Sequence, residues 1–423
     1  MLIIVTDDQR LGTMRAMRAT KEIFRRDGVA YRNAFVTTPF CCPSRASIMS
    51  GLYTHNHDVE TGARGEADSF DESETIQREL KGAGYRAAVF GKFLNGWTLK
   101  NSPKHFDEWA IFGEAAPDGY YGGTWNVDGT REEIEPYSTT YIRERALAFM
   151  KKGERSDDQP WFMYLAPAAA HFPYVAQPRF RHAPVGELNI NPAITETDLS
   201  DKPEFVQSRT RGVALAHRVR KEQLRTLMSV DRMIAALADA MVRLGERNTV
   251  LIFTSDNGFL WGEHRLTQKR FPYVPSVRVP LYLRWPGMPS GDPTDNRLVA
   301  NIDIAATIFD AVGIEPAYEL DGRSLLADGS RDRLLLEFWA NPNSQETDGG
   351  LPSWASNITP EMQYIEWYTD EGLLLEAEYY DLNADPWQLT NLLGDNDVTN
   401  DPDRVSLSVQ LSQDRSCAGA GCP

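Results

Sequence analysis

The sequence predicts an α/β protein with a large mixed, mostly parallel sheet sandwiched by helices and a small C-terminal α+β subdomain. The 423 residues are too many for one small core. Short continuous apolar runs, typical of buried parallel strands, recur up to residue 254 and alternate with helical periodicity. Beyond residue 328 the β-rich runs are short, which indicates antiparallel strands. We therefore expect an α/β domain over 1–327, a subdomain over 328–400 and a flexible tail over 401–423.

The composition is that of a soluble globular protein, with 42% hydrophobic and 25% charged residues. The net charge of −16 argues against a nucleic-acid partner, because phosphate contacts need a basic surface. An anionic ligand would have to be attracted by local positive charge, since the overall field repels it. No apolar stretch reaches about 18 residues, so we expect no membrane span.

The two ends of the chain carry few signals. No signal-peptide pattern precedes the apolar residues 2–5. This predicts a cytoplasmic protein as the sequence is written, or a secreted or periplasmic one if the start is truncated. The four cysteines do not form a disulfide framework. Cys417 and Cys422 could close a small loop, but we expect them to lie in the flexible tail.

The first predicted strand, residues 2–5, ends in Asp7 and Asp8. Ligands of open α/β sheets bind at the carboxyl ends of the strands. Two adjacent carboxylates repel each other there unless a cation neutralises them. The alternative is a solvated Asp-Asp turn.

The most unusual segment is Cys41-Cys42-Pro43-Ser44-Arg45, which precedes a predicted helix that ends at Ser50 and Gly51. Cys41 would lie at the N-terminal end of this helix, where the macrodipole favours negative charge. Arg45 adds a fixed positive charge one turn further on. The arrangement favours a nucleophile above an anion site. The alternatives are two buried cysteines or a redox pair.

Two further predicted strands place basic side chains at their ends. Residues 86–90 precede Lys92, and residues 160–165 precede His171. Residues 139–150 between them predict a helix with one buried face. A solvated lysine and a hydrogen-bonded loop histidine are the structural alternatives.

The next segments repeat the same pattern. Residues 177–208 predict a long surface loop, and residues 230–244 an amphipathic helix. Residues 249–254 form the clearest strand, which ends in Asp256, Asn257 and Gly258, although this triplet is also a good turn. His264 and Lys269 follow directly.

The segment Cys41-x-Pro43-Ser44-Arg45, with Gly51 six positions after the arginine, resembles the signature of the type I, formylglycine-dependent sulfatases of the alkaline phosphatase superfamily. The resemblance continues in the same order along the chain through roughly residue 395. It implies an alkaline phosphatase-like fold. It also implies that a formylglycine-generating enzyme oxidises Cys41 to formylglycine, whose hydrate supplies the attacking oxygen.

The resemblance also implies the roles of individual residues. The implied metal ligands are Asp7, Asp8, Cys41 as formylglycine, Asp256 and Asn257, and the implied catalytic residues are Cys41, Arg45, Lys92, His171 and Lys269. Oxygen ligands suit a hard cation, so we expect Ca²⁺, with Mg²⁺ as the alternative. We expect His264 to contact substrate, and His182 is a second candidate for the role of His171.

The segment Gly91-Lys92-Phe93-Leu94-Asn95 is similar to that of N-acetylglucosamine-6-sulfatases, whereas many sulfatases carry a histidine in place of Leu94. The expected activity is therefore hydrolysis of a sulfate monoester, on a small molecule or an oligosaccharide and preferably on a sulfated sugar. Simple aryl sulfates are further expected substrates. The alternatives are a phosphodiester or phosphonate monoester hydrolase of the same superfamily and a non-catalytic binder of sulfated ligands.

Overall fold

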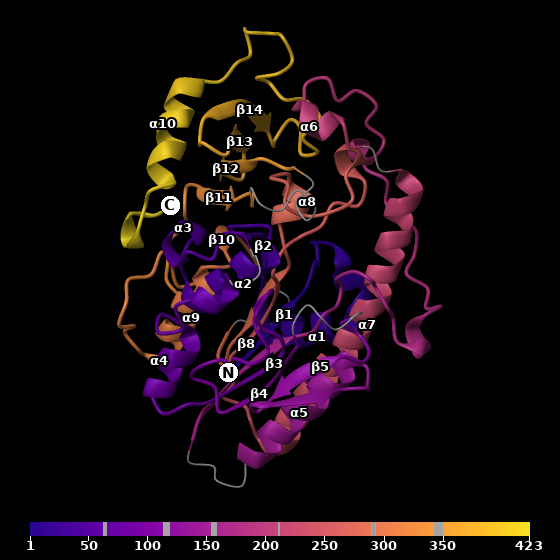
Figure 1. The fold of residues 1–423 in the computed structure, drawn as a ribbon, viewed down its shortest axis with the longest axis vertical. Helices are drawn as coiled ribbons and strands as arrows, with labels where there is room; N and C mark the ends of the chain where they lie inside the picture. Colours follow the sequence, from indigo (N-terminus) through magenta and orange to yellow (C-terminus); the bar gives the residue numbers. More distant parts are fainter. Residues whose placement is uncertain are drawn as a thin grey trace.

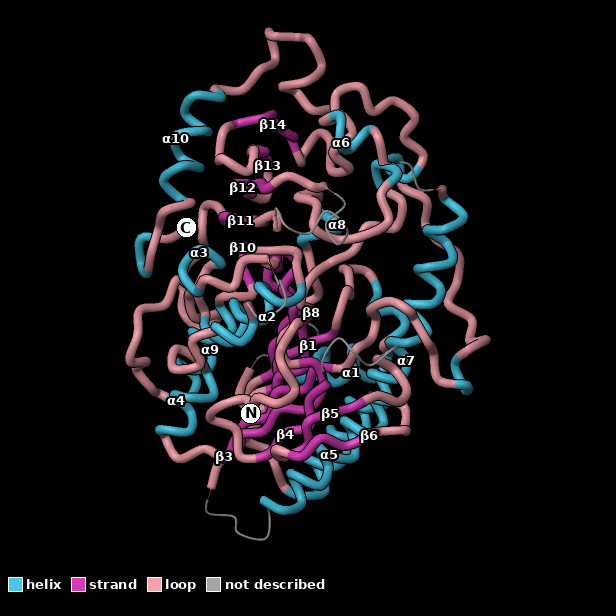
Figure 2. The backbone as a smooth tube through the Cα atoms, in the orientation of Figure 1, coloured by secondary structure: helices cyan, strands magenta, loops and turns pink. Residues whose placement is uncertain are grey.

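The computed structural model describes residues 1–61, 66–112, 119–153, 159–209, 212–288, 291, 293–341 and 350–423. A ten-stranded mixed sheet runs through the larger part of the molecule, with helices on both faces (Figure 1). The α/β fold predicted from the sequence is thus confirmed. A second, four-stranded sheet lies beyond one edge of the first (Figure 2). None of the described helices has the length and apolarity that crossing a membrane requires.

The strands of the large sheet lie in the order β10 (Thr294–Ala300), β2 (Gly28–Phe35), β9 (Leu281–Arg284), β8 (Leu251–Ser255), β1 (Leu2–Thr6), β7 (Trp161–Ala166), β3 (Arg86–Lys92), β4 (Glu108–Phe112), β5 (Thr124–Val127) and β6 (Thr130–Glu133). The central strands β8, β1, β7, β3 and β4 are all parallel. Their carboxyl ends therefore meet at one edge of the sheet, where ligands of such sheets bind.

Two layers of helices cover this sheet. On one face lie α1 (Arg18–Asp27), α5 (Ser138–Gly153) and α7 (Val213–Leu244), and on the other α2 (Cys41–Ser50), α4 (Ile76–Gly82) and α9 (Asp303–Val312). The shorter helices are α3 (Thr54–His57), α6 (Glu204–Gln207) and α8 (Val274–Val277). Each face of the sheet thus packs its own apolar core, as expected for strands with both faces buried.

Helix α7 differs from the prediction because it begins at Val213 rather than near residue 230. Its first half buries polar side chains, among them Gln223, Thr226 and Ser229. These residues interrupt the apolar periodicity on which the prediction relied. The preceding segment, residues 177–208, is largely irregular as predicted, with short 3-10 turns at Pro178–Phe180 and Pro192–Ile194.

The C-terminal sheet is antiparallel, in the order β11 (Leu334–Phe338), β12 (Ser353–Ile358), β13 (Met362–Tyr368) and β14 (Leu374–Asp381). One apolar cluster joins this sheet to the large domain, since Trp354 and Trp367 belong to the same cluster as Phe35 and Tyr53. The boundary at residues 327 and 328 stays a prediction.

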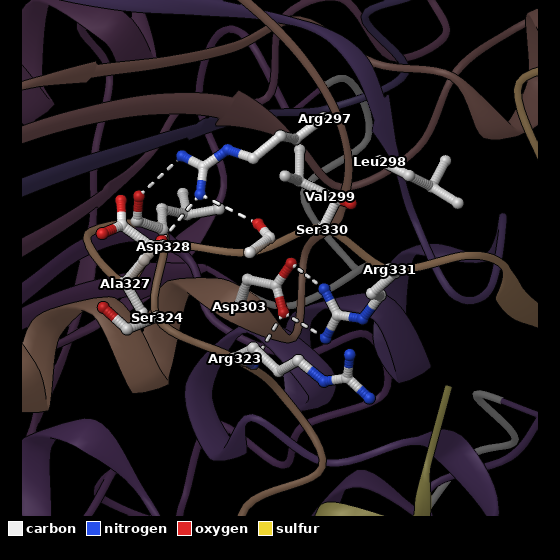
Figure 3. A pocket seen from close by; sticks show the side chains of 12 residues that line it. Arg297, Leu298, Val299, Asp303, Arg323, Ser324, Ala327, Asp328, Ser330 and Arg331 are labelled. Carbon is white, nitrogen blue, oxygen red and sulfur yellow. Dashed lines mark hydrogen bonds and ion pairs between the residues drawn. The ribbon is translucent and has the colours of Figure 1, made fainter.

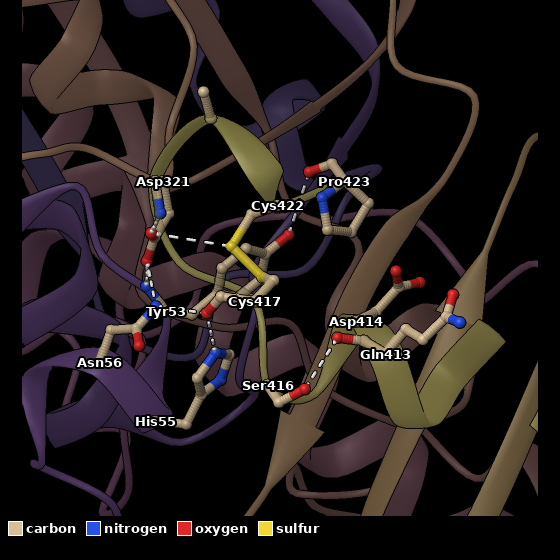
Figure 4. The surroundings of a disulfide bond; sticks show 12 residues. Tyr53, His55, Asn56, Asp321, Gln413, Asp414, Ser416, Cys417, Cys422 and Pro423 are labelled. Carbon is tan, nitrogen blue, oxygen red and sulfur yellow. Dashed lines mark hydrogen bonds between the residues drawn. A yellow bond between two sulfur atoms is a disulfide. The ribbon is translucent and has the colours of Figure 1, made fainter. Parts of the chain in front are cut away.

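The C-terminal segment is ordered, in contrast to the predicted flexible tail. Helix α10 spans Arg404–Asp414, and Cys417 and Cys422 form a disulfide. The disulfide loop is bound to the segment after α2 (Figure 4): the Cys417 carbonyl oxygen accepts hydrogen bonds from His55 and Asn56, each at 3.0 Å. These partners lie more than 350 positions away in sequence, which is why local composition did not reveal them.

A cavity of about 290 Å³ lies between β10, α9 and the turn that leads into β11 (Figure 3). Its arginines are already bound to protein. Arg331 pairs with Asp303 through two contacts of 2.5 and 2.6 Å, and Arg297 donates to the carbonyl oxygens of Leu325 and Ala327. These contacts anchor the chain that enters the C-terminal sheet to α9.

Replacing Cys417 and Cys422 together by serine should lower the free energy of unfolding by about 2 kcal/mol, the value expected for such a short closed loop. The loss should appear as a lower urea midpoint with an unchanged slope. Reducing the wild-type protein with dithiothreitol should produce the same shift, and the double variant should not respond to the reductant. An unchanged midpoint in both experiments would contradict a stabilising disulfide.

Candidate active site

The acidic side chains of the candidate site leave two neighbouring strands. Asp7 and Asp8 follow β1, and Asp256 and Asn257 follow the adjacent β8. The Asp8 amide donates to Asp256 Oδ1 at 3.2 Å. Consecutive side chains of a strand point to opposite faces, but Asp8 has a left-handed φ of 59°, which ends this alternation. All four side chains are at most 3% exposed.

Helix α2 holds Cys41 at its first position, and all ten residues of the helix are buried. Gly51 ends the helix with a φ of 76°, and its amide donates to the Ser47 carbonyl oxygen at 2.8 Å. A Cβ atom at Gly51 would lie 2.9 Å from the Ala305 side chain on α9. The motif therefore fixes a closely packed helix, which places Cys41 Sγ 3.6 Å from Asp7 Oδ1.

Lys92 reaches the same carboxylate from the end of β3. The preceding Gly91 has a φ of 115°, and a Cβ atom there would lie 2.0 Å from the carbonyl oxygen of Ala166 on β7. Only glycine fits such an approach of two backbones. Lys92 Nζ lies 2.5 Å from Asp7 Oδ2 and the residue is 7% exposed.

Arg45 is fully buried and neutralises Asp256. Its Nε and Nη2 atoms each lie 2.8 Å from Asp256 Oδ2, and Nη1 donates to the Lys92 carbonyl oxygen at 2.9 Å. The Asp7 carboxylate lies 3.5 Å from the same guanidinium. Arg45 therefore joins the ends of β1, β3 and β8.

Lys269 comes from the loop after β8. This loop folds back on itself, since the Leu260 amide donates to the Gln268 carbonyl oxygen at 2.9 Å. As a result Lys269 Nζ lies 2.5 Å from both Asp8 Oδ1 and Cys41 Sγ. The second lysine thus contacts the thiol directly.

His171 is the most accessible member of the group, with a side chain 37% exposed. Its Nδ1 lies 2.7 Å from the Phe172 carbonyl oxygen, which can only accept, so Nδ1 carries a hydrogen. Its Nε2 lies 3.9 Å from Oδ2 of Asp8, one of the three carboxylates (Asp7, Asp8 and Asp256) that form the acidic cluster of the site. The histidine thus presents one nitrogen to the site from the solvent side.

The electrostatics follow from burial and from this pairing. Burial alone would raise the pKa of Asp7, but Lys92, His171 and Arg45 outweigh it and hold the pKa well below its ordinary value. Burial, together with the charge of Asp7, raises the pKa of the Cys41 thiol to about 12. An unmodified Cys41 therefore stays a protonated, weakly nucleophilic thiol near neutral pH.

The donor set fits a hard metal ion. Ligand atoms of Asp7, Asp8, Cys41 and His171 all lie within 4.8 Å of one another. Asn257 Nδ2 donates to Asp8 Oδ1 at 2.7 Å, while its buried Oδ1 has no hydrogen-bond partner among the described residues. An unsatisfied buried carbonyl costs about 1–3 kcal/mol. A cation bound by Asn257 Oδ1 and the carboxylates would remove this cost.

Two predicted histidines lie in different surroundings. His264 is buried: its Nδ1 lies 2.7 Å from Glu196 Oε2, and its ring packs on Tyr273. Within the described part of the chain, no hydrogen bond, ion pair or ring contact joins His264 to Asp7, Asp8 or Asp256, so its substrate contact stays a prediction. His182 is exposed on the segment after His171.

Sequence reasoning missed Gln223 on α7. Its Nε2 lies within hydrogen-bond reach of the carbonyl oxygens of Asp8 (3.4 Å) and Ala170 (3.2 Å), and its Oε1 accepts from the Trp261 indole at 2.6 Å. It thereby fixes the two backbones that carry Asp8 and His171. Its position seven residues before the buried Val230 was a helical signal that could have revealed it.

This sheet, with its acidic, basic and cysteine side chains at the carboxyl edge, defines an alkaline phosphatase-like α/β protein. The chain belongs to the sulfatase family: the family model Sulfatase matches residues 1–314. A second model, described as N-sulphoglucosamine sulphohydrolase, C-terminal, matches residues 262–415.

Named relatives agree with this family. The chain is 33% identical to an extracellular sulfatase Sulf-1 homolog of Caenorhabditis elegans over 77% of its own length, and it spans about half of that relative (48%). It is 28% identical to human N-acetylglucosamine-6-sulfatase, over 100% of this chain and 85% of the relative. It is 25% identical to the N-acetylglucosamine-6-O-sulfatase of Bacteroides thetaiotaomicron, over 87% and 76%.

Solved structures share the fold. One is a complex of a protein with its substrate D-glucosamine-2-N,6-O-disulfate, with a TM-score of 0.79 and 22% identity over 97% of this chain and 96% of the other. A phosphonate monoester hydrolase of Silicibacter pomeroyi has a TM-score of 0.74 and 20% identity, over 98% and 95%.

Proposed function

We propose that this chain hydrolyses a sulfate monoester on a sugar, using a formylglycine made from Cys41 and a bound Ca²⁺ ion. Water cleaves the S–O bond, and the products are the sugar alcohol and inorganic sulfate. The substrate class rests on the two relatives that are named for N-acetylglucosamine 6-sulfate. The chemistry rests on the charge balance of the site.

That charge balance is the observation that carries the proposal. Three buried carboxylates are matched by three buried cations, namely Asp7, Asp8 and Asp256 by Arg45, Lys92 and Lys269. Without a metal ion, the formal charges of these six side chains therefore sum to zero. A divalent cation would make the site positive by two charges, which favours an anionic substrate even in a chain of net charge −16.

The side chains have distinct tasks around the ester. When bound, the metal ion would polarise the sulfate oxygens, and the hydrated formylglycine would supply the attacking oxygen. Lys92, which contacts Asp7, and Lys269, which contacts Asp8, bind the oxygens of the sulfate. Arg45 holds Asp256 in place, and its charge opposes the rise in the pKa of Asp256 that burial and the Asp7 charge cause. With both ring nitrogens protonated, His171 gives the proton on Nε2 to the departing alkoxide and keeps the hydrogen on Nδ1, which the Phe172 carbonyl oxygen accepts.

Calcium should stabilise the folded protein. At a concentration of about 100 times the Kd, a bound ligand adds about 2.7 kcal/mol to the free energy of unfolding. Chelated protein titrated with CaCl₂ should therefore show a rising Tm, and the rise should be smaller with MgCl₂. Replacing Asn257 by alanine should reduce the rise, whereas replacing the exposed Asn383 should not. A Tm unaffected by either ion would refute the metal site.

Peptide mass spectrometry across residues 41–45 tests the function most directly. In protein produced together with a formylglycine-generating enzyme, Cys41 should lose about 18 Da, the change from thiol to aldehyde. The same protein should release sulfate from 6-O-sulfated N-acetylglucosamine and from an aryl sulfate. An unmodified thiol would exclude the formylglycine mechanism. Faster cleavage of the phosphate or phosphonate ester of the same alcohol would favour the phosphonate hydrolase alternative.

For the cellular location we propose an oxidising compartment. Disulfides such as Cys417–Cys422 persist there and are rare in the cytosol. This supports the secreted or periplasmic alternative. Alkylation of the protein in intact source cells, followed by peptide mass spectrometry, should find both cysteines protected, and labelled thiols would point to the cytoplasm.

A further inference from the structure

A second polar cavity lies on the helical face of the large sheet that carries α5 and α7. Its volume is about 90 Å³, several times the space that one water molecule needs. It is bounded by the first turn of α5, the middle of α7 and the segment that follows His171. The polar side chains that line it are Thr139, Thr140, Gln177, Ser229, Arg143, Arg179 and Arg232. Two of them are already paired, since Gln177 Nε2 donates to the Thr140 hydroxyl at 2.7 Å.

One buried hydroxyl group in this cavity lacks a partner. Thr139 is 2% exposed, yet its hydroxyl oxygen makes no hydrogen bond within the described part of the chain. The Ser229 hydroxyl is next to that of Tyr137, which in turn donates to the Val175 carbonyl oxygen at 3.0 Å. Because an unpaired buried polar group costs free energy, the Thr139 hydroxyl indicates a polar occupant.

The charges around the cavity favour an anionic occupant. Arg179 and Arg232 are exposed residues for which no ion pair exists among the described residues. Arg143 has a weak partner, Glu144, at 3.4 Å on the surface. Thr139 also lies in the first turn of the 16-residue helix α5, where the macrodipole favours negative charge. Three arginines, the unpaired Thr139 hydroxyl and a helix N-terminus together suit a tetrahedral oxyanion.

The cavity is on the same side of the molecule as the candidate active site. Helix α5 leads into β7, which is parallel to β3, so the first turn of α5 lies at the carboxyl edge of the sheet (Figure 1). Gln177 is six residues after His171, so their Cα atoms are at most about 22 Å apart. The Tyr120 hydroxyl, which donates to the His171 carbonyl oxygen at 2.8 Å, ties this region to the active site.

We infer that this cavity binds a second sulfate group of a sulfated oligosaccharide whose reacting sulfate lies at Cys41. The inference rests on the proposed function and adds a preference to it: the enzyme acts on chains that carry more than one sulfate. Arg179 and Arg232 form the charged contacts at the mouth of the cavity. Thr139 donates to the oxyanion from its buried end.

Kinetics on two substrates test the inference. Replacing Arg232 by alanine should raise the KM for a polysulfated tetrasaccharide by about tenfold, the loss expected for one charge-assisted contact. The same change should leave kcat/KM for an aryl sulfate unaltered, because this substrate cannot reach the cavity. Thr139→Val, which removes the hydroxyl and keeps the volume, should raise the same KM. Arg243→Ala, an exposed arginine on the last turn of α7, is the matched control for loss of charge.

The outcomes separate this inference from the proposed function. Equal effects on both substrates, or no effect on either, would overturn it. If the wild type cleaves no sulfate ester, titration calorimetry with the tetrasaccharide still decides it, because Arg232→Ala should weaken binding and Arg243→Ala should not. If inorganic sulfate or phosphate binds the cavity with an Arg232-dependent affinity and the tetrasaccharide does not, the cavity holds a free ion and the inference is wrong.

Discussion

Replacing Cys41 by alanine should lower kcat/KM for sulfate esters by at least about 10³-fold, the scale on which enzymes lose activity without their nucleophile. The reason is geometric. Sγ is the atom that Lys269 approaches to 2.5 Å and that lies 3.6 Å from Asp7, so an alanine at this position leaves no side-chain atom between the lysine and the carboxylate to carry the attacking oxygen. The measurement is the steady-state rate with an aryl sulfate, after mass spectrometry has established the state of Cys41 in the wild type.

The adjacent Cys42 provides the matched control. It is equally buried, but its thiol faces the Asn95 carbonyl oxygen at 3.4 Å, away from the acidic cluster. Cys42→Ala should therefore cost about 1–2 kcal/mol of stability through a small cavity and leave the activity of the folded protein largely intact. Comparable loss of activity in both variants would mean that the helix has been disturbed rather than the nucleophile removed. Full activity of Cys41→Ala would refute the mechanism.

Replacing Arg45 by alanine should lower the free energy of unfolding by about 3–5 kcal/mol, because the buried Asp256 carboxylate loses its partner. Lys92 also loses the donor to its carbonyl oxygen. The effect should be measured by urea denaturation of chelated protein, since a metal ion would share the charge of Asp256. Arg45→Lys keeps the charge but not the two contacts to Asp256 Oδ2. Its free energy of unfolding should therefore lie between that of Arg45→Ala and that of the wild type.

Arg25, an exposed arginine, is the control for the stability that the buried Arg45 contributes. Arg25 on α1 pairs with Glu22 at 3.0 Å, and both side chains are about half exposed. Arg25→Ala should therefore change stability by less than about 1 kcal/mol, as exposed ion pairs generally do. If Arg45→Ala and Arg25→Ala cost the same, the buried network does not hold the strand ends together in the way described.

Much of the fold could be predicted because strand and helix signals are local. The runs that became β1, β3, β7 and β8 are short, apolar and bounded by polar residues, so the parallel core was visible in the sequence. The part of α7 before Val230 was not, because Gln223 and Ser229 occupy its buried face in place of apolar side chains. The ordered C-terminal segment depends on a disulfide and on contacts to His55 and Asn56, which local patterns do not encode.

Part of the candidate site could likewise be predicted from the sequence, and part could not. The resemblance to sulfatases grouped Asp7, Asp8, Asp256 and Asn257 in advance, and their positions after predicted parallel strands agree with that grouping because such strand ends share an edge. The partner of His264 could not be found this way, since Glu196 is 68 residues earlier in the irregular segment before α7. A histidine near basic residues in sequence suggested a substrate contact, whereas its ring lies buried between Glu196 and Tyr273.

The burial of the whole of α2 bears on whether Cys41 can be modified before or after the chain folds. Cys41 is 1% exposed, and Gly51 at the end of the helix packs closely against Ala305 of α9. Under the proposed formylglycine mechanism, the enzyme that converts this thiol must therefore act while the segment is still extended, before α2 packs. Conversion and folding would then compete in time, and a chain that folds first would keep an unmodified thiol. Slower synthesis or a larger supply of the converting enzyme should increase the converted fraction without any change in the sequence.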